Sequence, residues 1–214
     1  MPLTNRKKSI MLYVLGSIVI GFLLLTAFVF FFPSSIIDHE FSAEVQEHQN
    51  LLLDNSMKAI SWFGYIPNAP VMVLGTALIF LIFKYKREAL FLVLTLLSGL
   101  ISSIIKLLVN RPRPSEPLVR IIGKTQQQSF PSGHVLFYVM FFGFLTLLMY
   151  QIKVIPKYIR ILVSITGMLL IFAIPFSRIY LGAHWFTDVV GGFLLGILCL
   201  YILSFLYLSK KEDK

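Results

Sequence analysis

The chain alternates between long apolar runs and short polar connections. The apolar runs cover residues 10–32, 69–83, 89–109, 135–150, 159–176 and 189–208. A helix needs about 20 mostly apolar residues to cross a bilayer, and most of these runs approach that length. None shows the alternation of barrel strands, and only helices or closed barrels satisfy the backbone polar groups in lipid. The pattern therefore predicts an all-α, polytopic membrane protein with six transmembrane helices.

Two of the runs need separate interpretation. The second is short, and we expect its helix to start earlier, near Trp62, with Pro67 and Pro70 in its first turns. The first is preceded by basic residues, as a signal peptide would be. Its apolar core is too long for one, and residues 30–33 (Phe-Phe-Phe-Pro) offer no small-residue cleavage site. We therefore interpret it as a spanning helix.

The connection between residues 33 and 62 is long and acidic. Its acidic residues are Asp38, Glu40, Glu44, Glu47 and Asp54. Apolar residues recur at near-helical spacing at Ile37, Phe41, Val45, Leu52 and Met57. This spacing is typical of an amphipathic helix. The segment either lies on the membrane surface or packs as a cap over the helices, and the sequence does not favour one over the other.

Composition agrees with a membrane protein and limits its chemistry. The chain has 214 residues, of which 57% are hydrophobic and 14% charged, with a mean hydropathy of +0.82. We find no internal repeat and expect residues 1–214 to form a single membrane-embedded domain. Cys199 is the only cysteine, which excludes an intrachain disulfide and a cysteine-based metal site. We interpret it as a small apolar side chain of the core.

The formal net charge of +9 is explained by membrane orientation and not by nucleic acid. If six helices alternate, four basic clusters fall on the side of both termini, which the positive-inside rule makes cytoplasmic. They are Arg6-Lys7-Lys8, Lys84/Lys86/Arg87, Lys153/Lys157/Arg160 and Lys210/Lys211/Lys214. The connections that carry the chemistry described next then face outside.

Three polar segments occur at the outer ends of the predicted helices, at residues 106–114, 129–134 and 177–188. Three cations, Lys106, Arg113 and Arg178, are suited to phosphate oxygens, and Ser132 adds a hydroxyl group. The Pro-Ser-Gly turn opens a helix at Gly133, where N–H groups and the helix dipole favour an anion. Few acidic residues stand nearby to neutralise these cations. The segments therefore predict a phosphate site.

Two histidines and an aspartate add reactivity to this site. His184 and Asp188 are four residues apart, so they are neighbours on one face if the last helix begins near His184. The carboxylate then fixes one ring nitrogen and leaves the other free to attack phosphorus. The product is a phosphohistidine, which water hydrolyses. His134 is placed to protonate the leaving oxygen and then activate that water.

Each of these residues alone has a structural interpretation. A lone Lys106 or Arg178 is more often an interfacial anchor, and a lone His134 more often bonds to backbone. Asp188 alone pairs structurally with Arg178. The combination favours the functional interpretation. Arg111 and Arg113 both precede a proline, so either one reaches the phosphate. His39 and His48 stand apart and are interpreted as solvated or structural.

The three segments together resemble a known family. Lys-x6-Arg-Pro from Lys106, Pro-Ser-Gly-His ending at His134, and Ser-Arg-x5-His-x3-Asp ending at Asp188 are similar to the signature motifs of the type-2 phosphatidic acid phosphatase superfamily. This family of lipid phosphate phosphatases is related to the vanadium haloperoxidases. The resemblance implies a six-helix bundle and metal-independent dephosphorylation. It also implies His184 as nucleophile, Asp188 orienting it and His134 as acid. Phosphate is held by Lys106, Arg113, Ser132, Gly133 and Arg178.

The sequence thus predicts a metal- and cofactor-free lipid phosphatase of bacterial type. Its expected partners are membrane lipid and a phosphorylated lipid substrate: undecaprenyl diphosphate, phosphatidylglycerophosphate, phosphatidic acid or a lipid A-type head group. The first two are weakly preferred, on resemblance alone. The alternative is a lipid-phosphate binder or transporter without catalysis, which leaves both histidines and Asp188 unexplained. A haloperoxidase-like activity is a third, weaker alternative. Gly192 and Gly196 permit close helix packing, which we expect within one bundle.

Overall fold

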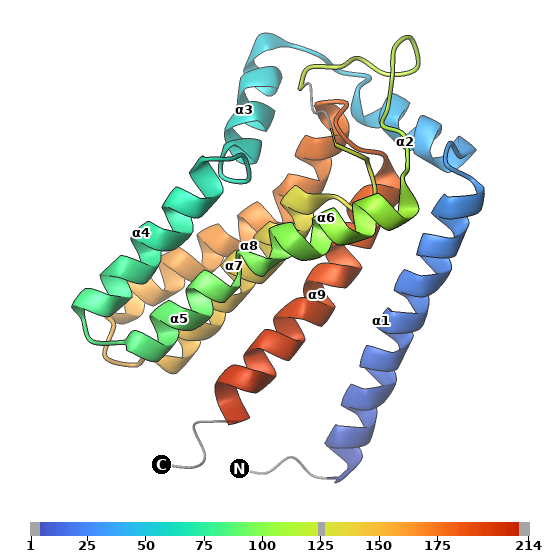
Figure 1. Ribbon diagram of the computed structural model, residues 1–214. Coiled ribbons are helices and arrows are strands. Elements are labelled where there is room, and N and C mark those ends of the chain that lie inside the picture. The colour runs from blue at the N-terminus through green and yellow to red at the C-terminus, as the bar shows by residue number, and fades with distance from the viewer. Residues whose placement is uncertain (1–4, 124–126, 210–214) are drawn as a thin grey trace.

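The computed structural model describes residues 5–123 and 127–209, and the described residues form helices and loops (Figure 1). The helices are α1 (Asn5–Phe31), α2 (Ile36–Val45), α3 (Leu51–Trp62), α4 (Asn68–Ile82), α5 (Lys86–Leu94), α6 (Leu97–Val109), α7 (Gly133–Gln151), α8 (Lys157–Tyr180) and α9 (Phe186–Ser209). The predicted all-α class is confirmed. The predicted lysine cluster after residue 209 lies outside the described residues.

The predicted spans agree with five helical segments long and apolar enough to cross a membrane. These are residues 9–31, 86–109, 133–151, 157–180 and 186–209. The remaining predicted span is α4, an apolar helix of 15 residues. The predicted start near Trp62 is wrong: α3 ends at Trp62, a turn follows, and α4 begins only at Asn68, with Pro67 at its N-cap. The chain is a multi-pass membrane protein.

The predicted helix over residues 89–109 is divided into α5 and α6. The backbone N–H of Thr95 donates to the carbonyl of Leu92, as does its hydroxyl group, at 3.0 and 2.6 Å. These i→i−3 bonds tighten the turn and interrupt the α-helical ladder. α6 then ends at Asn110, which has a left-handed backbone conformation that asparagine tolerates, and Pro112 prevents a further turn.

The centre of the bundle is α7, which is apolar around its whole circumference. Most of its residues are buried, as expected of a helix without a polar face. α8 and α9 pack against it. Two glycines of α9 permit this approach: a Cβ on Gly192 would lie 2.6 Å from the carbonyl oxygen of Ser132, and one on Gly196 would lie 2.7 Å from Cβ of Val139. The glycine spacing therefore serves packing within the bundle, as predicted.

The acidic outer connection folds into α2 and α3, which pack on α8 and, for α2, also on α9. Ser35 and Asn50 cap their N-termini by accepting hydrogen bonds from the backbone N–H groups of Asp38 and Leu53. Of the two interpretations, the structure supports the cap, since Asp38 and Asp54 are buried beneath it. Contact of its exposed apolar side chains with the membrane surface stays a prediction.

The two ends of the bundle differ in the connections they carry (Figure 1). α1 begins and α9 ends in the lower part of the view, where the α4–α5 and α7–α8 connections also lie. At the opposite end, α2 and α3 meet the loops that follow α6 and α8. All three predicted motif segments belong to this second end. The fold thus gathers them beneath the α2–α3 cap.

Candidate active site

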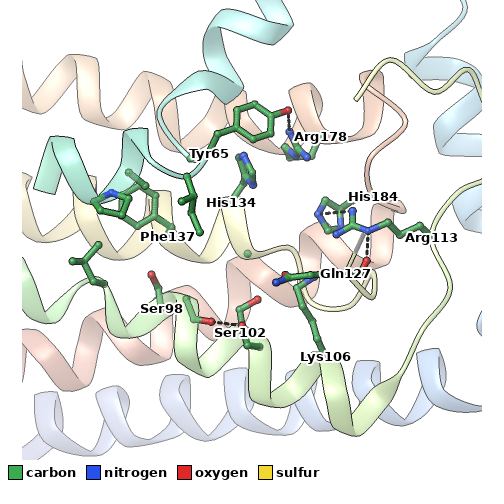
Figure 2. A pocket seen from close by; sticks show the side chains of 18 residues that line it. Tyr65, Ser98, Ser102, Lys106, Arg113, Gln127, His134, Phe137, Arg178 and His184 are labelled. Atoms are coloured by element: carbon green, nitrogen blue, oxygen red, sulfur yellow. Dashed lines mark hydrogen bonds between the residues drawn. The ribbon is translucent and has the colours of Figure 1, made fainter. Parts of the chain in front are cut away.

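A cavity of about 480 Å³ opens at the end of the bundle where the motif segments meet (Figure 2). It is lined by residues of the α3–α4 turn, α6, the start of α7 and the loops around residues 113 and 184. The predicted residues that line it are Lys106, Arg113, Gly133, His134, Arg178 and His184. Ser132 and Asp188 are fully buried directly behind this lining.

The three cations enter the cavity from different elements. Lys106 Nζ donates to the carbonyl oxygens of Gln128 and Ser129, and Arg113 donates to those of Gln127 and Ala183. None of the described residues that line the cavity is acidic. Burial, followed by repulsion from the Arg178 charge, lowers the pKa of Arg113 to about 10, so it keeps its charge at neutral pH. Three cations without a carboxylate among them favour a bound anion.

Arg178 is the most deeply placed of the cations. Its Nη1 atom donates to the hydroxyl groups of Ser61, at 3.0 Å, and Tyr65, at 2.9 Å. Its Nε and Nη2 atoms are buried and have no hydrogen-bond partner among the described residues. Buried donors of a charged group are costly unless paired. The fork of Arg178 is therefore free to bind two oxygens of one anion.

The start of α7 adds neutral donors to the same place. The backbone N–H of Ser132 donates to the carbonyl of Asp188 at 2.9 Å, which fixes the turn before the helix. The Ser132 hydroxyl does not cap α7 and has no partner in the part of the chain that the structure describes. Gly133 is the first residue of the helix, where unpaired N–H groups favour an anion.

The two histidines line the cavity from different elements, His134 from the start of α7 and His184 from the loop before α9 (Figure 2). His184 Nδ1 lies 3.5 Å from Oδ2 of Asp188 and has no hydrogen-bond partner among the described residues. Its Nε2 atom is 3.4 Å from Nη1 of Arg113. Burial, followed by the charges of Arg113 and Lys106, holds the pKa of His184 well below its ordinary value. The imidazole is therefore neutral at pH 7, the form that can act as a nucleophile.

His134, the second residue of α7, is held by a turn that the sequence did not single out. The ring of Tyr65 lies edge-on to the His134 ring, with centroids 4.7 Å apart. A Cβ on Gly64 would lie 2.4 Å from Cδ2 of His134, so only glycine permits this contact. Tyr65 thus contacts both His134 and Arg178. The turn Gly-Tyr-Ile-Pro was a signal for a bend, but nothing in it indicated a contact with the motifs.

Asp188 has more partners than the sequence indicated. Its carboxylate accepts hydrogen bonds from the backbone N–H of Trp185, the hydroxyl of Ser129 and Nη1 of Arg111. The proposed structural pair of Asp188 with Arg178 is therefore replaced by a pair with Arg111. Arg111 does not line the cavity, whereas Arg113 does. Of the two arginines, only Arg113 is positioned at the cavity, so phosphate binding by Arg113 is the prediction that we keep.

On its other side, Arg111 donates to Oδ2 of Asp38 at 2.6 Å, and both side chains are fully buried. Asp38 also accepts from the backbone N–H and hydroxyl of Thr187. The sequence did not distinguish Asp38 from its acidic neighbours in the cap. Of the two interpretations of His39, solvated or structural, the structure supports the second: its ring stacks on Trp185 with 5.1 Å between ring centroids.

Comparisons with known proteins agree with this geometry. A family model described as the PAP2 superfamily matches residues 87–212. The chain is 28% identical to phosphatidylglycerophosphatase B of Bacillus subtilis, over 63% of this chain and 64% of that protein. It is 30% identical to undecaprenyl-diphosphatase of Sulfolobus acidocaldarius, over 71% of this chain and 69% of that protein. The chain thus spans slightly less than two thirds of the length of phosphatidylglycerophosphatase B.

Two solved structures share the fold. The transmembrane PAP2-type phosphatidylglycerolphosphate phosphatase from Bacillus subtilis superposes with a TM-score of 0.74 and 24% identity, over 90% of this chain and 94% of that chain. LpxE of Aquifex aeolicus superposes with a TM-score of 0.61 and 24% identity, over 77% of this chain and 93% of that chain. The matched family model, the membrane bundle and the gathered motif residues lead to one conclusion: the chain belongs to the PAP2 superfamily.

Proposed function

We propose that the protein is a membrane lipid phosphatase that hydrolyses the phosphomonoester or diphosphate of a lipid through a phosphohistidine on His184. One observation carries the proposal: a neutral histidine, with its Nδ1 atom 3.5 Å from a buried carboxylate, lines a cavity with three cations. Cations alone are sufficient for a binding or transport protein. The second histidine and the support of Asp188 are needed only for chemistry.

The residues divide the reaction into two displacements. His184 Nε2 attacks phosphorus, and the bond from phosphorus to the leaving oxygen breaks as that oxygen takes a proton from His134. Lys106, Arg113 and Arg178 stabilise the charge on the three equatorial oxygens. A water molecule then gives its proton to His134 and attacks the phosphohistidine, which releases inorganic phosphate and restores both histidines.

The cavity walls suit a lipid. Besides the charged groups, the lining includes five apolar residues: Ile66, Ala69, Pro70, Leu96 and Phe137. A phosphate at the charged side leaves the apolar tail between helices or in the bilayer. By resemblance to the relatives, the candidate substrates are phosphatidylglycerophosphate, undecaprenyl diphosphate and phosphatidic acid.

The decisive experiment measures phosphate release by the detergent-purified protein in EDTA from those three lipids and from a phosphorylated lipid A-type head group. We expect release from at least one lipid, inhibition by vanadate and loss of release in His184→Ala. His48→Ala, a change at an exposed histidine of the cap, is the matched control. A base-stable, acid-labile phosphoprotein should form with the unaltered chain and should not form with His184→Ala. Vanadate binding without release from any lipid would instead support the binding or transport function.

The orientation is part of the proposal. Lys84, Lys86, Arg87 and the cluster at residues 153–160 lie at the end of the bundle away from the cavity, which the positive-inside rule makes cytoplasmic. The termini are then cytoplasmic and the cavity faces outside. In a Cys199→Ser background, Gln127→Cys should react with an impermeant thiol reagent on intact cells, and Lys86→Cys should not. The reverse labelling pattern would refute this orientation.

A further inference from the structure

The cavity extends beyond the phosphate-binding cations along one face of α6. Ser98, Ser102 and Lys106 are spaced four residues apart, so they lie on the same face of the helix. All three are buried and all three line the cavity. Figure 2 shows them in a row along α6, with Lys106 at the charged end. With a rise of about 1.5 Å per residue, Ser102 lies about 6 Å and Ser98 about 12 Å from Lys106 along the axis.

Ser102 carries a buried polar group that the protein does not satisfy. Its side chain is 3% exposed, and its Oγ atom has no hydrogen-bond partner among the described residues. A serine in a helix usually donates to the carbonyl four residues earlier, as the neighbouring Ser103 does to Gly99 at 2.8 Å. Ser102 Oγ instead stands 3.1 Å from the place of a Cβ on Gly133, beside the start of α7. It therefore lies beside Gly133, next to the proposed phosphate position.

The chemistry of this wall is polar but uncharged. Beyond the three cations, the described lining residues of the cavity are hydroxyl-bearing, amide-bearing, aromatic or apolar. A second phosphate group at this place would lack a cation of its own, and burying an unpaired charge is expensive. Hydroxyl groups instead donate to and accept from neutral oxygens. The wall fits an uncharged hydroxyl or ester oxygen a few bonds from the phosphate.

We propose that Ser98 and Ser102 form a neck subsite, which hydrogen-bonds the neutral hydroxyl or ester oxygens next to the phosphate of a glycerol-based lipid. This inference rests on the proposed phosphatase function and narrows its substrate class. Phosphate monoesters with an oxygen-bearing neck are the preferred substrates. Isoprenyl diphosphates, which present a second phosphate and then hydrocarbon, are poorer ones.

The test compares two monophosphates with tails of similar length in the full-length, detergent-purified protein. Phosphatidic acid carries neck oxygens, and a long-chain alkyl phosphate does not. Ser102→Ala should lower kcat/KM for phosphatidic acid by about fivefold to tenfold, the effect of one buried hydrogen bond. The value for the alkyl phosphate should stay within about twofold. Ser98→Ala should lower kcat/KM for phosphatidic acid by a smaller factor and again spare the alkyl phosphate. The hydroxyl of Ser103 is already bonded to the carbonyl of Gly99, so Ser103→Ala should leave kcat/KM unchanged for both substrates.

Other results would overturn the proposal. Equal losses of kcat/KM with both monophosphates would show that Ser102 supports the phosphate site or the fold. A raised vanadate inhibition constant would then indicate the phosphate site, and an unchanged one would indicate the fold. An unchanged kcat/KM for phosphatidic acid, or a larger loss with an isoprenyl diphosphate, would also refute the neck subsite. Failure of the proposed function gives a different result, since the unaltered protein would then release phosphate from neither lipid.

Discussion

The guanidinium of Arg111 lies between two carboxylates, with Nη1 2.5 Å from Oδ1 of Asp188 and Nη2 2.6 Å from Oδ2 of Asp38. None of the three side chains is exposed to solvent. Asp188 also faces His184, so the cap helix α2 is connected to the proposed nucleophile through two buried ion pairs. The position of the nucleophile therefore depends on a helix that carries no motif residue.

Removing Asp38 should destabilise the protein. Asp38→Ala leaves Arg111 with one carboxylate partner in a buried place, and loss of one member of a buried pair costs about 3–5 kcal/mol of folding free energy. We expect a lower midpoint of thermal inactivation, measured as the phosphate-release activity that remains after heating. Glu40→Ala, an exposed change in the same helix, is the control. Equal midpoints for both variants would contradict the structural role of Asp38.

Arg111 and Arg113 should fail in different ways. Arg113→Ala removes a cation from the cavity, so vanadate inhibition should weaken by about tenfold to a hundredfold, the range for a hydrogen bond to a charged group. Its thermal midpoint should change little. Arg111→Ala leaves two buried carboxylates and should chiefly lower that midpoint. Inhibition and thermal inactivation, measured on both variants, check the assignment, and reversed effects would exchange the two roles.

Stability should depend on pH through His184. Burial and the neighbouring cations hold its folded pKa well below its ordinary value, so below about pH 6.5 the unfolded chain binds a proton that the folded chain does not. The stability contributed by the neutral ring is present above that pH and is lost as the pH falls toward the folded pKa. The slope for one such group is at most about 1.4 kcal/mol per pH unit. Between pH 8 and pH 5, the thermal midpoint should fall less steeply for His184→Gln than for the unaltered protein. Parallel curves of midpoint against pH would exclude a contribution of His184 to the pH dependence.

Tyr65 should act as a positioning residue. Tyr65→Phe keeps the ring against His134 but removes the hydroxyl that accepts from Arg178 Nη1. Because that bond involves a charged group, we expect kcat/KM to fall by about tenfold or more and the vanadate inhibition constant to rise with it. Tyr158→Phe, at an exposed tyrosine, is the control. A lowered thermal midpoint with unchanged vanadate inhibition would indicate a structural role only.

The helices and the motif residues could be predicted because their signals are local. An apolar run is sufficient to indicate a spanning helix. The spacing of His184 and Asp188 predicted that they lie close together, although α9 begins at Phe186 and His184 lies in the loop before it, not on a shared helix face. The break at Thr95 was missed because the hydropathy of residues 86–109 is continuous, whereas the hydrogen bonds of a single hydroxyl decide the break.

The supporting contacts could not be predicted because they join distant parts of the chain. Asp38 and Arg111 are 73 residues apart, and Tyr65 and Arg178 are 113 apart. Nothing in an acidic surface-like segment distinguishes buried Asp38 from exposed Glu40 and Glu44. Only the packing of α2 against α8 and α9 selects it. The roles of the motif residues themselves stay predictions until the variants are measured.

The cap and the α3–α4 turn also have an evolutionary consequence. Both precede residue 87, where the match to the family model begins, yet Asp38 supports Asp188 and Tyr65 contacts His134. Drift in this part of the chain can change rate and selectivity while every signature residue is retained. Two relatives with identical motifs need not share a substrate, and part of the divergence between them is to be sought in the first 86 residues.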